Sequence, residues 1–266
     1  MPHSPSRHLL SQNFLVDATT IRRYARSVGG GPGDLVVEVG AGDGRLTAAL
    51  AAGGATIHAH EIDPRLAGRL RARDLTNVHC HQGDFLRTRP PERAFRVAGN
   101  IPYSVTSGIV GWCLRAPLLT SATLITQLEY ARKRTGDYGR WSRLTVETWP
   151  AFGWHLGGRI HRSRFRPVPR VDSAVLHLDR RAEPLLPAAS LTGFRRCVEL
   201  GFSGKGGSLH ASLRTAYPRA LVDAGFRAAN IDRAAVVAYV HPDQWIALYL
   251  VLSAVSGAPG RRGRRR

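Results

Sequence analysis

The chain has 266 residues, 43% of them hydrophobic, so it can form one sizeable core and a smaller second unit. Its 38 lysines and arginines against 19 acidic residues give a formal net charge of +19, which usually indicates a polyanionic partner, most often nucleic acid. The three cysteines include no C-x-x-C pair, which argues against a disulfide framework and a zinc site. The N-terminus lacks the hydrophobic run of a signal peptide, and no apolar stretch is long enough to span a bilayer, so we expect a cytoplasmic protein.

Apolar runs and turn residues predict that strands and helices alternate over the first 100 residues. The predicted elements, in chain order, are helix 18–28, strand 35–39, helix 46–52, strand 56–60, helix 64–73, strand 78–81 and strand 95–98. This alternation is typical of an α/β fold with a doubly wound, Rossmann-like sheet. In such sheets, ligands bind at the carboxyl ends of the strands.

The second half of the chain is expected to complete the sheet and then become helical. Late strands are predicted at 145–149 and 174–178, and helices at 188–202, 208–216, 218–225, 229–236 and 242–255. The sequence therefore predicts one larger domain at 1–180 and a smaller helical domain at 181–256. A basic, disordered tail is expected at 257–266.

A glycine-rich turn follows the strand at 35–39. Gly40 and Gly42 allow the backbone to turn sharply and to approach a ligand closely. Dinucleotides also bind to such turns, but the third glycine comes one residue too early for G-x-G-x-x-G, and Arg45 occupies that position. Glu38 and Asp43 would repel a pyrophosphate and attract an ammonium and a sulfonium. S-adenosylmethionine carries both groups, so we predict that it is the cofactor.

Acidic residues also follow the next two predicted strands. Glu61 lies about 20 residues beyond the turn, where a carboxylate can accept hydrogen bonds from two ribose hydroxyls. Asp84 closes the third strand and could accept from an adenine amine, with Ile62 and Phe85 as apolar walls for the ring. An ordered set of acids on successive strand ends favours a cofactor site over unrelated surface residues.

The tetrapeptide Asn100, Ile101, Pro102 and Tyr103 follows the fourth strand and is predicted to be the catalytic loop. The amine of adenine is a poor nucleophile, so it must be held with its lone pair directed at the methyl carbon. The Asn100 side-chain oxygen and the Ile101 carbonyl could accept its two N–H groups, and Pro102 would stiffen the turn. Tyr103 could stack on the purine. A plain Asx-Pro turn is the structural alternative.

Two basic segments are candidates for RNA contact. In the first, Phe165 could cover the face of a flipped base opposite Tyr103, while the surrounding arginines hold phosphates. The alternative is a basic surface loop with Phe165 in the core. The second segment lies at 130–143 and could instead be a solvated helix end. The predicted RNA-binding residues are Arg132, Lys133, Arg134, Arg140, Arg162, Arg164 and Arg166.

These motifs occur in the order found in the rRNA adenine-N6 methyltransferases, which the chain resembles over roughly residues 7–215. The matching segments are 12–15, 38–42, 61, 83–85, 99–103 and 165–173. The resemblance implies that Gln12, Asn13 and Leu15 also contact the cofactor. It further implies that the C-terminal helical domain helps to hold RNA.

The segment at 129–142 and the arginine-rich tail resemble the Erm branch in antibiotic-producing actinomycetes. That branch methylates an adenine of 23S rRNA, with one or two methyl groups, and confers resistance to macrolides, lincosamides and streptogramin B. We therefore expect 23S rRNA as partner and a monomeric enzyme. The alternatives are a 16S rRNA dimethyladenosine transferase and a non-catalytic rRNA-binding assembly factor. Intact Asn100 and Tyr103 argue against the latter. A DNA adenine methyltransferase fits the remaining motifs less well.

Overall fold

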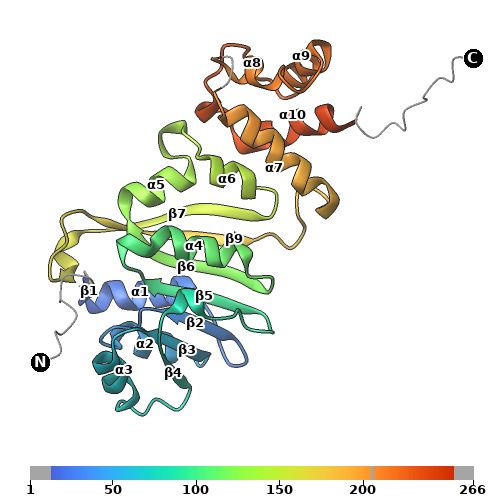
Figure 1. Cartoon of the computed structure of the whole chain (residues 1–266). Helices are drawn as coiled ribbons and strands as arrows, with labels where there is room; N and C mark the ends of the chain where they lie inside the picture. Colours follow the sequence, from blue (N-terminus) through green and yellow to red (C-terminus); the bar gives the residue numbers. More distant parts are fainter. Residues whose placement is uncertain (1–12, 205–206, 255–266) are drawn as a thin grey trace, which may run out of the picture. The chain divides into compact units, whose positions relative to one another are not determined.

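The computed structural model describes residues 13–204 and 207–254, which divide into two compact units. The first unit comprises the chain up to residue 132 together with 153–180, and the second comprises 133–152 and the chain from 181 onward. The second unit thus includes 133–152, which lies within the predicted first domain at 1–180 (Figure 1). Gln12 and the predicted tail at 257–266 lie outside the described residues.

The first unit is built on a seven-stranded sheet with the strand order β4-β3-β2-β5-β6-β9-β7. Neighbouring strands from β4 to β6 are parallel, and β9 is antiparallel to β6. The strands are β2 (Leu35–Val39), β3 (Thr56–Glu61), β4 (Val78–Gln82), β5 (Phe95–Asn100), β6 (Leu119–Gln127), β7 (Phe152–Ile160) and β9 (Ser173–Arg180). Every residue of β2 is buried, as expected for a parallel strand covered on both faces. The predicted α/β fold is confirmed.

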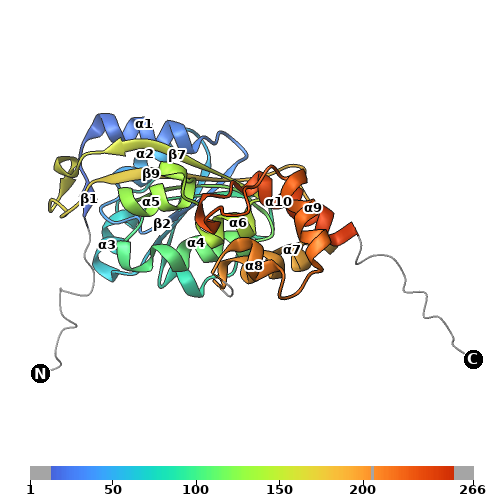
Figure 2. The same ribbon diagram turned by 90° about the horizontal axis from the view of Figure 1, so that it is seen from above.

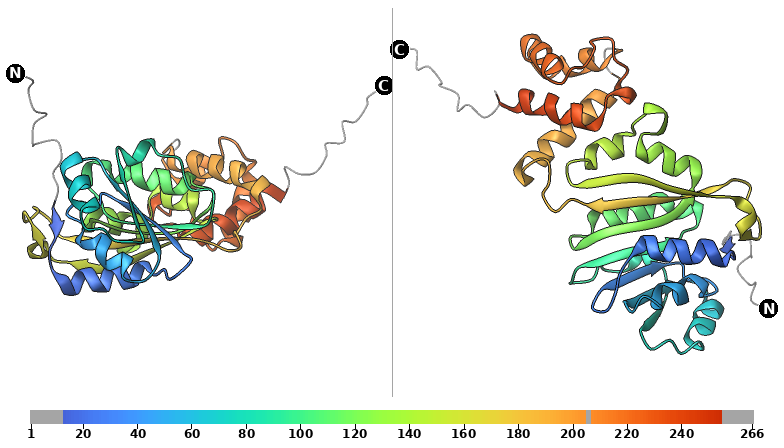
Figure 3. Two further views of the ribbon diagram at one scale, coloured as in Figure 1. Left: turned by 90° about the horizontal axis from the view of Figure 1, so that it is seen from below. Right: turned by 180° about the vertical axis from the view of Figure 1, so that it is seen from behind.

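Helices cover both faces of this sheet. The helices of the first part of the chain are α1 (Ala18–Val28), α2 (Arg45–Ala51), α3 (Pro64–Arg71), α4 (Thr106–Arg115) and α5 (Leu128–Thr135). Helices α1 and α2 share one core cluster on the sheet, in which Ile21, Tyr24 and Leu50 are buried. Helix α4 lies on the opposite face from α1 (Figures 2 and 3). A two-stranded sheet of β1 (Phe14–Leu15) and β8 (Phe165–Arg166) adds to the unit.

The second unit is helical and has its own core, centred on Phe194, Phe226 and the fully buried Trp245. A Cβ on Gly201 would lie 2.4 Å from the Trp245 ring, so the glycine permits close packing there. The helices are α6 (Arg143–Thr148), α7 (Ala188–Phe202), α8 (Leu209–Leu213), α9 (Arg219–Ala228) and α10 (Pro242–Ala254). No helix among the described residues is long and apolar enough to cross a membrane.

Two predicted elements of this unit are wrong. The strand expected at 145–149 is part of α6, because Ser142 caps a helix there and accepts a hydrogen bond from the Thr145 amide. The helix expected at 229–236 is absent. Asn230 takes a left-handed conformation with φ of 50°, and the Ile231 amide bonds back to the Phe226 carbonyl, which ends α9.

Candidate active site

A cleft opens where β2, β3, β4 and β5 end, at the carboxyl edge of the sheet. This edge is where a doubly wound sheet binds ligands. The cleft brings together twelve of the predicted site residues, from five segments of the chain: Asn13, Leu15, Gly40, Gly42, Glu61, Ile62, Asp84, Phe85, Asn100, Ile101, Pro102 and Tyr103. The structure therefore makes one site of motifs that are up to 90 residues apart in the chain.

The glycine-rich turn gives the cleft its floor. Gly40 and Gly42 have φ values of 70° and 57°, in the left-handed region that favours glycine. A Cβ on Gly40 would approach nothing closer than the Asn100 carbonyl oxygen at 3.9 Å, so the side of the turn that faces the cleft is open. A Cβ on Gly42 would lie 3.0 Å from the Phe14 ring. The turn thus brings backbone to the cleft, and at Gly42 the Phe14 ring leaves no room for a side chain.

Glu61 is fixed at the end of β3 and is only 2% exposed. Its Oε2 accepts from the Gly42 amide at 2.8 Å, and its Oε1 accepts from the Asp63 amide at 2.9 Å. Each carboxylate oxygen can accept a second hydrogen bond. The residue therefore presents two oriented acceptors to the cleft, which suits a pair of neighbouring hydroxyl groups.

Asp84 lines the same cleft as two apolar side chains, Ile62 and Phe85. Its Oδ1 accepts from the Leu86 amide at 3.0 Å and so caps the short helical turn at Phe85–Arg87. Phe85 is buried against Trp112, with 4.5 Å between ring centroids, whereas Ile62 is 49% exposed. An exposed aliphatic side chain and a buried aromatic ring in one cleft can serve as apolar walls for a planar ligand.

Glu38, predicted to contact the cofactor, does not line the cleft. It is central in β2 and is fully buried. Burial raises the pKa of Glu38 to about 7; the carboxylates of Glu61 and Asp43 add to the increase, and the Thr47 hydroxyl opposes it. The Thr47 and Glu38 oxygens do not meet hydrogen-bond geometry with each other, so the carboxyl group is an unsatisfied polar group beside the turn.

We expect Glu38→Gln to stabilise the cofactor-free protein at neutral and higher pH. The pKa of Glu38 is about 7 in the folded state, above the ordinary 4.5. The contribution of this carboxyl group to the free energy of unfolding is therefore fully present below about pH 4.5 and is lost as the pH rises through 7. The shift corresponds to about 3 kcal/mol, or a Tm increase of roughly 5 °C above pH 7, with almost no change near pH 4.5. Thermal unfolding across this range tests it, with the exposed Glu92→Gln as control. An increase that did not depend on pH would contradict this account.

The catalytic loop is held at three points. The Asn100 side-chain amide donates to the Asn13 carbonyl at 2.7 Å, which orients its oxygen away from that partner. The Ile101 amide donates to the Ile125 carbonyl at 3.3 Å. The Tyr103 hydroxyl lies 3.0 Å from the Ser173 hydroxyl, and Ser173 is fully buried. The loop is thus positioned by Asn13, which precedes β1, and by β6 and β9 before any substrate is bound.

Tyr24 is a residue of this site that the sequence did not reveal. It lies on α1 and is 2% exposed, and its hydroxyl accepts from the Gly99 amide at 2.7 Å and donates to the Thr123 carbonyl. Burial raises the pKa of this hydroxyl. The hydroxyl therefore ties β5 to β6 at the residue immediately before Asn100. Nothing in an amphipathic helix pattern distinguishes such a tyrosine from an ordinary core aromatic.

Tyr24→Phe is expected to lower both stability and turnover. The change leaves the Gly99 amide and the Thr123 carbonyl without their partner, which costs about 2 kcal/mol of unfolding free energy. It also loosens the strand end that carries Asn100, so we expect kcat to fall roughly tenfold at a temperature well below the Tm. Tyr249→Phe is the matched control, because its hydroxyl donates to the Ser190 carbonyl in the second unit. If both variants lose only stability, Tyr24 does not position the loop.

Phe165 does not line the cleft, contrary to its predicted role opposite Tyr103. It is 1% exposed and belongs to the core cluster that contains Leu15 and Tyr24, because the pairing of β8 with β1 places Leu15 opposite Phe165. The alternative of a core phenylalanine in a basic loop is therefore the observed arrangement.

Three of the predicted RNA-binding arginines hold this loop together. Arg164 binds Asp17 and Thr20, Arg166 donates to the Ser163 and Phe165 carbonyls, and Arg162 donates to the Arg170 carbonyl. The other predicted segment shows similar local contacts. Arg132 pairs with Glu129 at 3.4 Å, and Arg134 donates to Ser142 at 2.8 Å. Lys133 lies on α5 between these two arginines, and Arg140 lies over the Tyr239 ring.

Comparison with known proteins identifies the family. Residues 4–254 match the model of the ribosomal RNA adenine dimethylase family. The chain belongs to this family. The predicted rRNA adenine-N6 methyltransferase activity is thereby confirmed, and the methyltransferases of this family use S-adenosylmethionine.

Three relatives illustrate the similarity. An rRNA adenine N-6-methyltransferase of Streptomyces fradiae is 56% identical over 261 residues, which cover 97% of this chain and 82% of the relative. The mycinamicin-resistance protein MyrB of Micromonospora griseorubida is 35% identical over 263 residues, covering 99% and 84%. The crystal structure of the 23S rRNA methyltransferase ErmE is 49% identical, covers 91% of this chain and 100% of its own, and has a TM-score of 0.88.

The described residues contain no group of histidine, cysteine, aspartate or glutamate side chains that could hold a metal ion. The cleft instead offers carboxylates, an amide and apolar walls. These groups fit an organic cofactor that carries hydroxyl groups and a flat ring.

Proposed function

We propose that this methyltransferase transfers methyl groups from S-adenosylmethionine to the N6 amine of an adenine in 23S rRNA, and so confers resistance to macrolides, lincosamides and streptogramin B. The observation that supports this reaction is that Asn100 and Tyr103 line the same cleft as Glu61 and Asp84. The likeness to ErmE and to the mycinamicin-resistance protein supports the choice of RNA and of phenotype. We expect a cytoplasmic monomer that adds one or two methyl groups.

The residues of the cleft fit the cofactor. Glu61 would accept from its two ribose hydroxyls, and Asp84 would accept from its adenine amine between Ile62 and Phe85. The open side of the turn at Gly40 and Gly42 would take its methionine portion, with Asn13 and Leu15 closing the cleft. Gln12 remains a predicted contact. When bound, S-adenosylmethionine supplies an electrophilic methyl group.

Asn100 and Ile101 would orient the substrate amine. Because the Asn100 side-chain nitrogen donates to Asn13, its oxygen is available to accept one N–H of the adenine amine. The Ile101 carbonyl would accept the other, which directs the nitrogen lone pair toward the methyl carbon. Positive charge grows on the nitrogen during transfer, so these acceptors bind the transition state more strongly than the ground state. No general base is required.

Tyr103 would serve as the stacking surface for the purine. Its hydroxyl contact with Ser173 fixes the ring orientation before substrate arrives, which reduces the entropy lost on binding. A base that reaches this ring must leave its stack in the RNA, and an aromatic face offsets part of that cost.

Expression in a macrolide-sensitive bacterium tests the proposed phenotype. We expect wild-type protein to raise the inhibitory concentrations of a macrolide, a lincosamide and a streptogramin B together, and Asn100→Ala to leave them at the level of the empty vector. If wild-type protein leaves all three unchanged while it methylates 16S rRNA, the alternative role in the small subunit is correct.

A further inference from the structure

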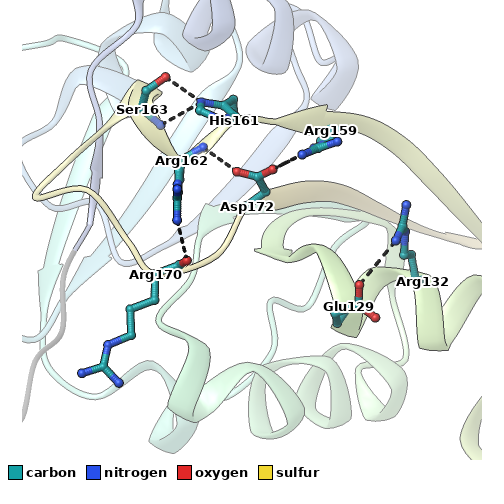
Figure 4. Close-up of polar contacts among 8 residues, drawn as sticks. All are labelled: Glu129, Arg132, Arg159, His161, Arg162, Ser163, Arg170 and Asp172. Atoms are coloured by element: carbon teal, nitrogen blue, oxygen red, sulfur yellow. Dashed lines mark hydrogen bonds and ion pairs between the residues drawn. The ribbon is translucent and has the colours of Figure 1, made fainter.

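A second cavity lies where β7 ends and the chain turns back toward β9. It is lined by side chains of Glu129, Arg159, His161, Arg162, Arg170 and Asp172, none of which lines the cofactor cleft (Figure 4). Of these residues, Arg162 was in the predicted RNA-binding set, and Arg170, Asp172 and Glu129 lie in the segments 165–173 and 129–142 that resemble the family.

Asp172 organises this cavity. Its side chain is 12% exposed and accepts at three points: the Arg162 amide at 2.9 Å, the Arg159 Nε at 2.8 Å and the Arg159 Nη2. The Arg162 amide and then the Arg159 guanidinium hold the pKa of Asp172 below its usual range. The carboxylate is therefore occupied within the protein, and the Arg159 guanidinium is held in one orientation with Nη1 left over (Figure 4).

The basic side chains of the cavity supply hydrogen-bond donors. The Ser163 amide donates to Nδ1 of His161 at 3.3 Å, so in the neutral ring the proton is on Nε2, which can donate. The Arg162 Nη1 donates to the Arg170 carbonyl at 3.1 Å. The Arg170 guanidinium extends away from Asp172 and has no partner among residues 13–204 and 207–254 (Figure 4).

The one other carboxylate in this lining, Glu129, pairs with Arg132 on α5 at 3.4 Å (Figure 4). Asp172 is thus matched at both oxygens and Glu129 at one, while Arg159, Arg170 and His161 keep unmatched N–H donors. A cavity of this kind suits an anion, and the planar fork of arginine matches a phosphate in particular.

We propose that this cavity binds a backbone phosphate of the RNA, beside the nucleotide whose adenine enters the cleft. The proposal rests on the proposed function. Asp172 directly precedes Ser173, whose hydroxyl contacts Tyr103, and the Asp172 carbonyl accepts from the Leu128 amide at 3.0 Å. The cavity and the stacking surface are therefore linked through two consecutive residues, Asp172 and Ser173. Phosphate contacts set the register of a nucleic acid on a protein, so Arg159 and Arg170 would fix where the target base enters.

Binding of a 23S rRNA fragment at several salt concentrations tests the site. Arg170→Ala removes a guanidinium that makes no internal contact, so the fold should be retained. We expect its Kd and KM for RNA to rise roughly tenfold and the dependence of log K on log salt to fall by about 0.7. The Kd of S-adenosylmethionine should stay constant. Arg69→Ala, on the exposed face of α3, removes the same charge elsewhere and should leave RNA binding unchanged.

A double variant separates a specific contact from general charge. Arg159→Ala leaves the Asp172 carboxylate facing the phosphate and should weaken RNA binding more than Arg170→Ala does. Arg159→Ala with Asp172→Asn restores the local net charge but not the contact, so binding should recover only to the level of Arg170→Ala. Arg159→Lys replaces Arg159→Ala if the latter loses thermal stability, since it keeps the charge but not the fork.

If the double variant and Arg170→Ala bind RNA as well as Arg69→Ala does, the proposed phosphate site is wrong while the proposed function stands. If wild-type protein transfers no methyl group to either rRNA, the proposed function fails instead. The salt dependence of binding would still decide whether this cavity holds a phosphate.

Discussion

Asn100→Ala is expected to lower kcat by roughly 10²–10³. The substitution removes the oxygen that would accept one N–H of the adenine amine, and it also removes the bond from the side-chain nitrogen to the Asn13 carbonyl. The lone pair of the amine is then no longer directed at the methyl carbon, while the carboxylates of Glu61 and Asp84 still hold the cofactor. Single-turnover methyl transfer at saturating RNA, with calorimetric titration of S-adenosylmethionine, measures both quantities.

Asn77→Ala provides the matched control. The Asn77 side-chain amide donates to the Ala51 and Ala55 carbonyls at 2.8 Å, away from the cleft, so its loss should affect the Tm and not kcat. We expect the Kd of S-adenosylmethionine to change by no more than about threefold in Asn100→Ala. Wild-type turnover in that variant would remove Asn100 from the catalytic loop.

Tyr103→Ala is expected to lower kcat/KM for RNA by about 10²-fold, since stacking of one base on an aromatic ring contributes 1–3 kcal/mol and misplacement adds to the loss. Tyr103→Phe keeps the ring and removes only the hydroxyl that contacts Ser173. Its loss should therefore be smaller, about threefold to tenfold. Steady-state kinetics on the same RNA fragment compares the two.

Ser173→Ala should reproduce the effect of Tyr103→Phe, because it breaks the same contact from the other side. The double variant should be no worse than either single variant, as expected when two changes remove one interaction. Equal losses in Tyr103→Ala and Tyr103→Phe would show that the hydroxyl, and not the ring, is the important group.

The parallel part of the sheet and most of the cleft could be predicted from the sequence. Strand β2 is an apolar run interrupted only by Glu38, and β3 ends at an acid, so the order of motifs reveals the carboxyl edge of a doubly wound sheet. The glycine turn, Glu61, Asp84 and Asn100 meet there for this reason. Local pattern was sufficient because each of these residues lies at a strand end or within a few residues of one.

Other parts depended on contacts that no local pattern contains. Strands β6 and β7 were missed, since polar residues interrupt the first and glycines the second. Glu38 lies within β2, where its side chain is buried in the core and does not line the cleft. Phe165 is buried because β8 pairs with β1. Tyr24 hydrogen-bonds to Gly99, 75 residues away in the chain, and Ser173 contacts Tyr103, 70 residues away. Such partners become visible only when the chain is folded.

The most direct test of this account is methyl transfer from radiolabelled S-adenosylmethionine to purified, unmodified 23S and 16S rRNA, with primer extension to map the modified position. We predict label in 23S rRNA and a stop at one adenine in its macrolide-binding loop, and neither with Asn100→Ala. A stop at paired adenines near the 3′ end of 16S rRNA, or RNA binding without label in either RNA, would contradict it.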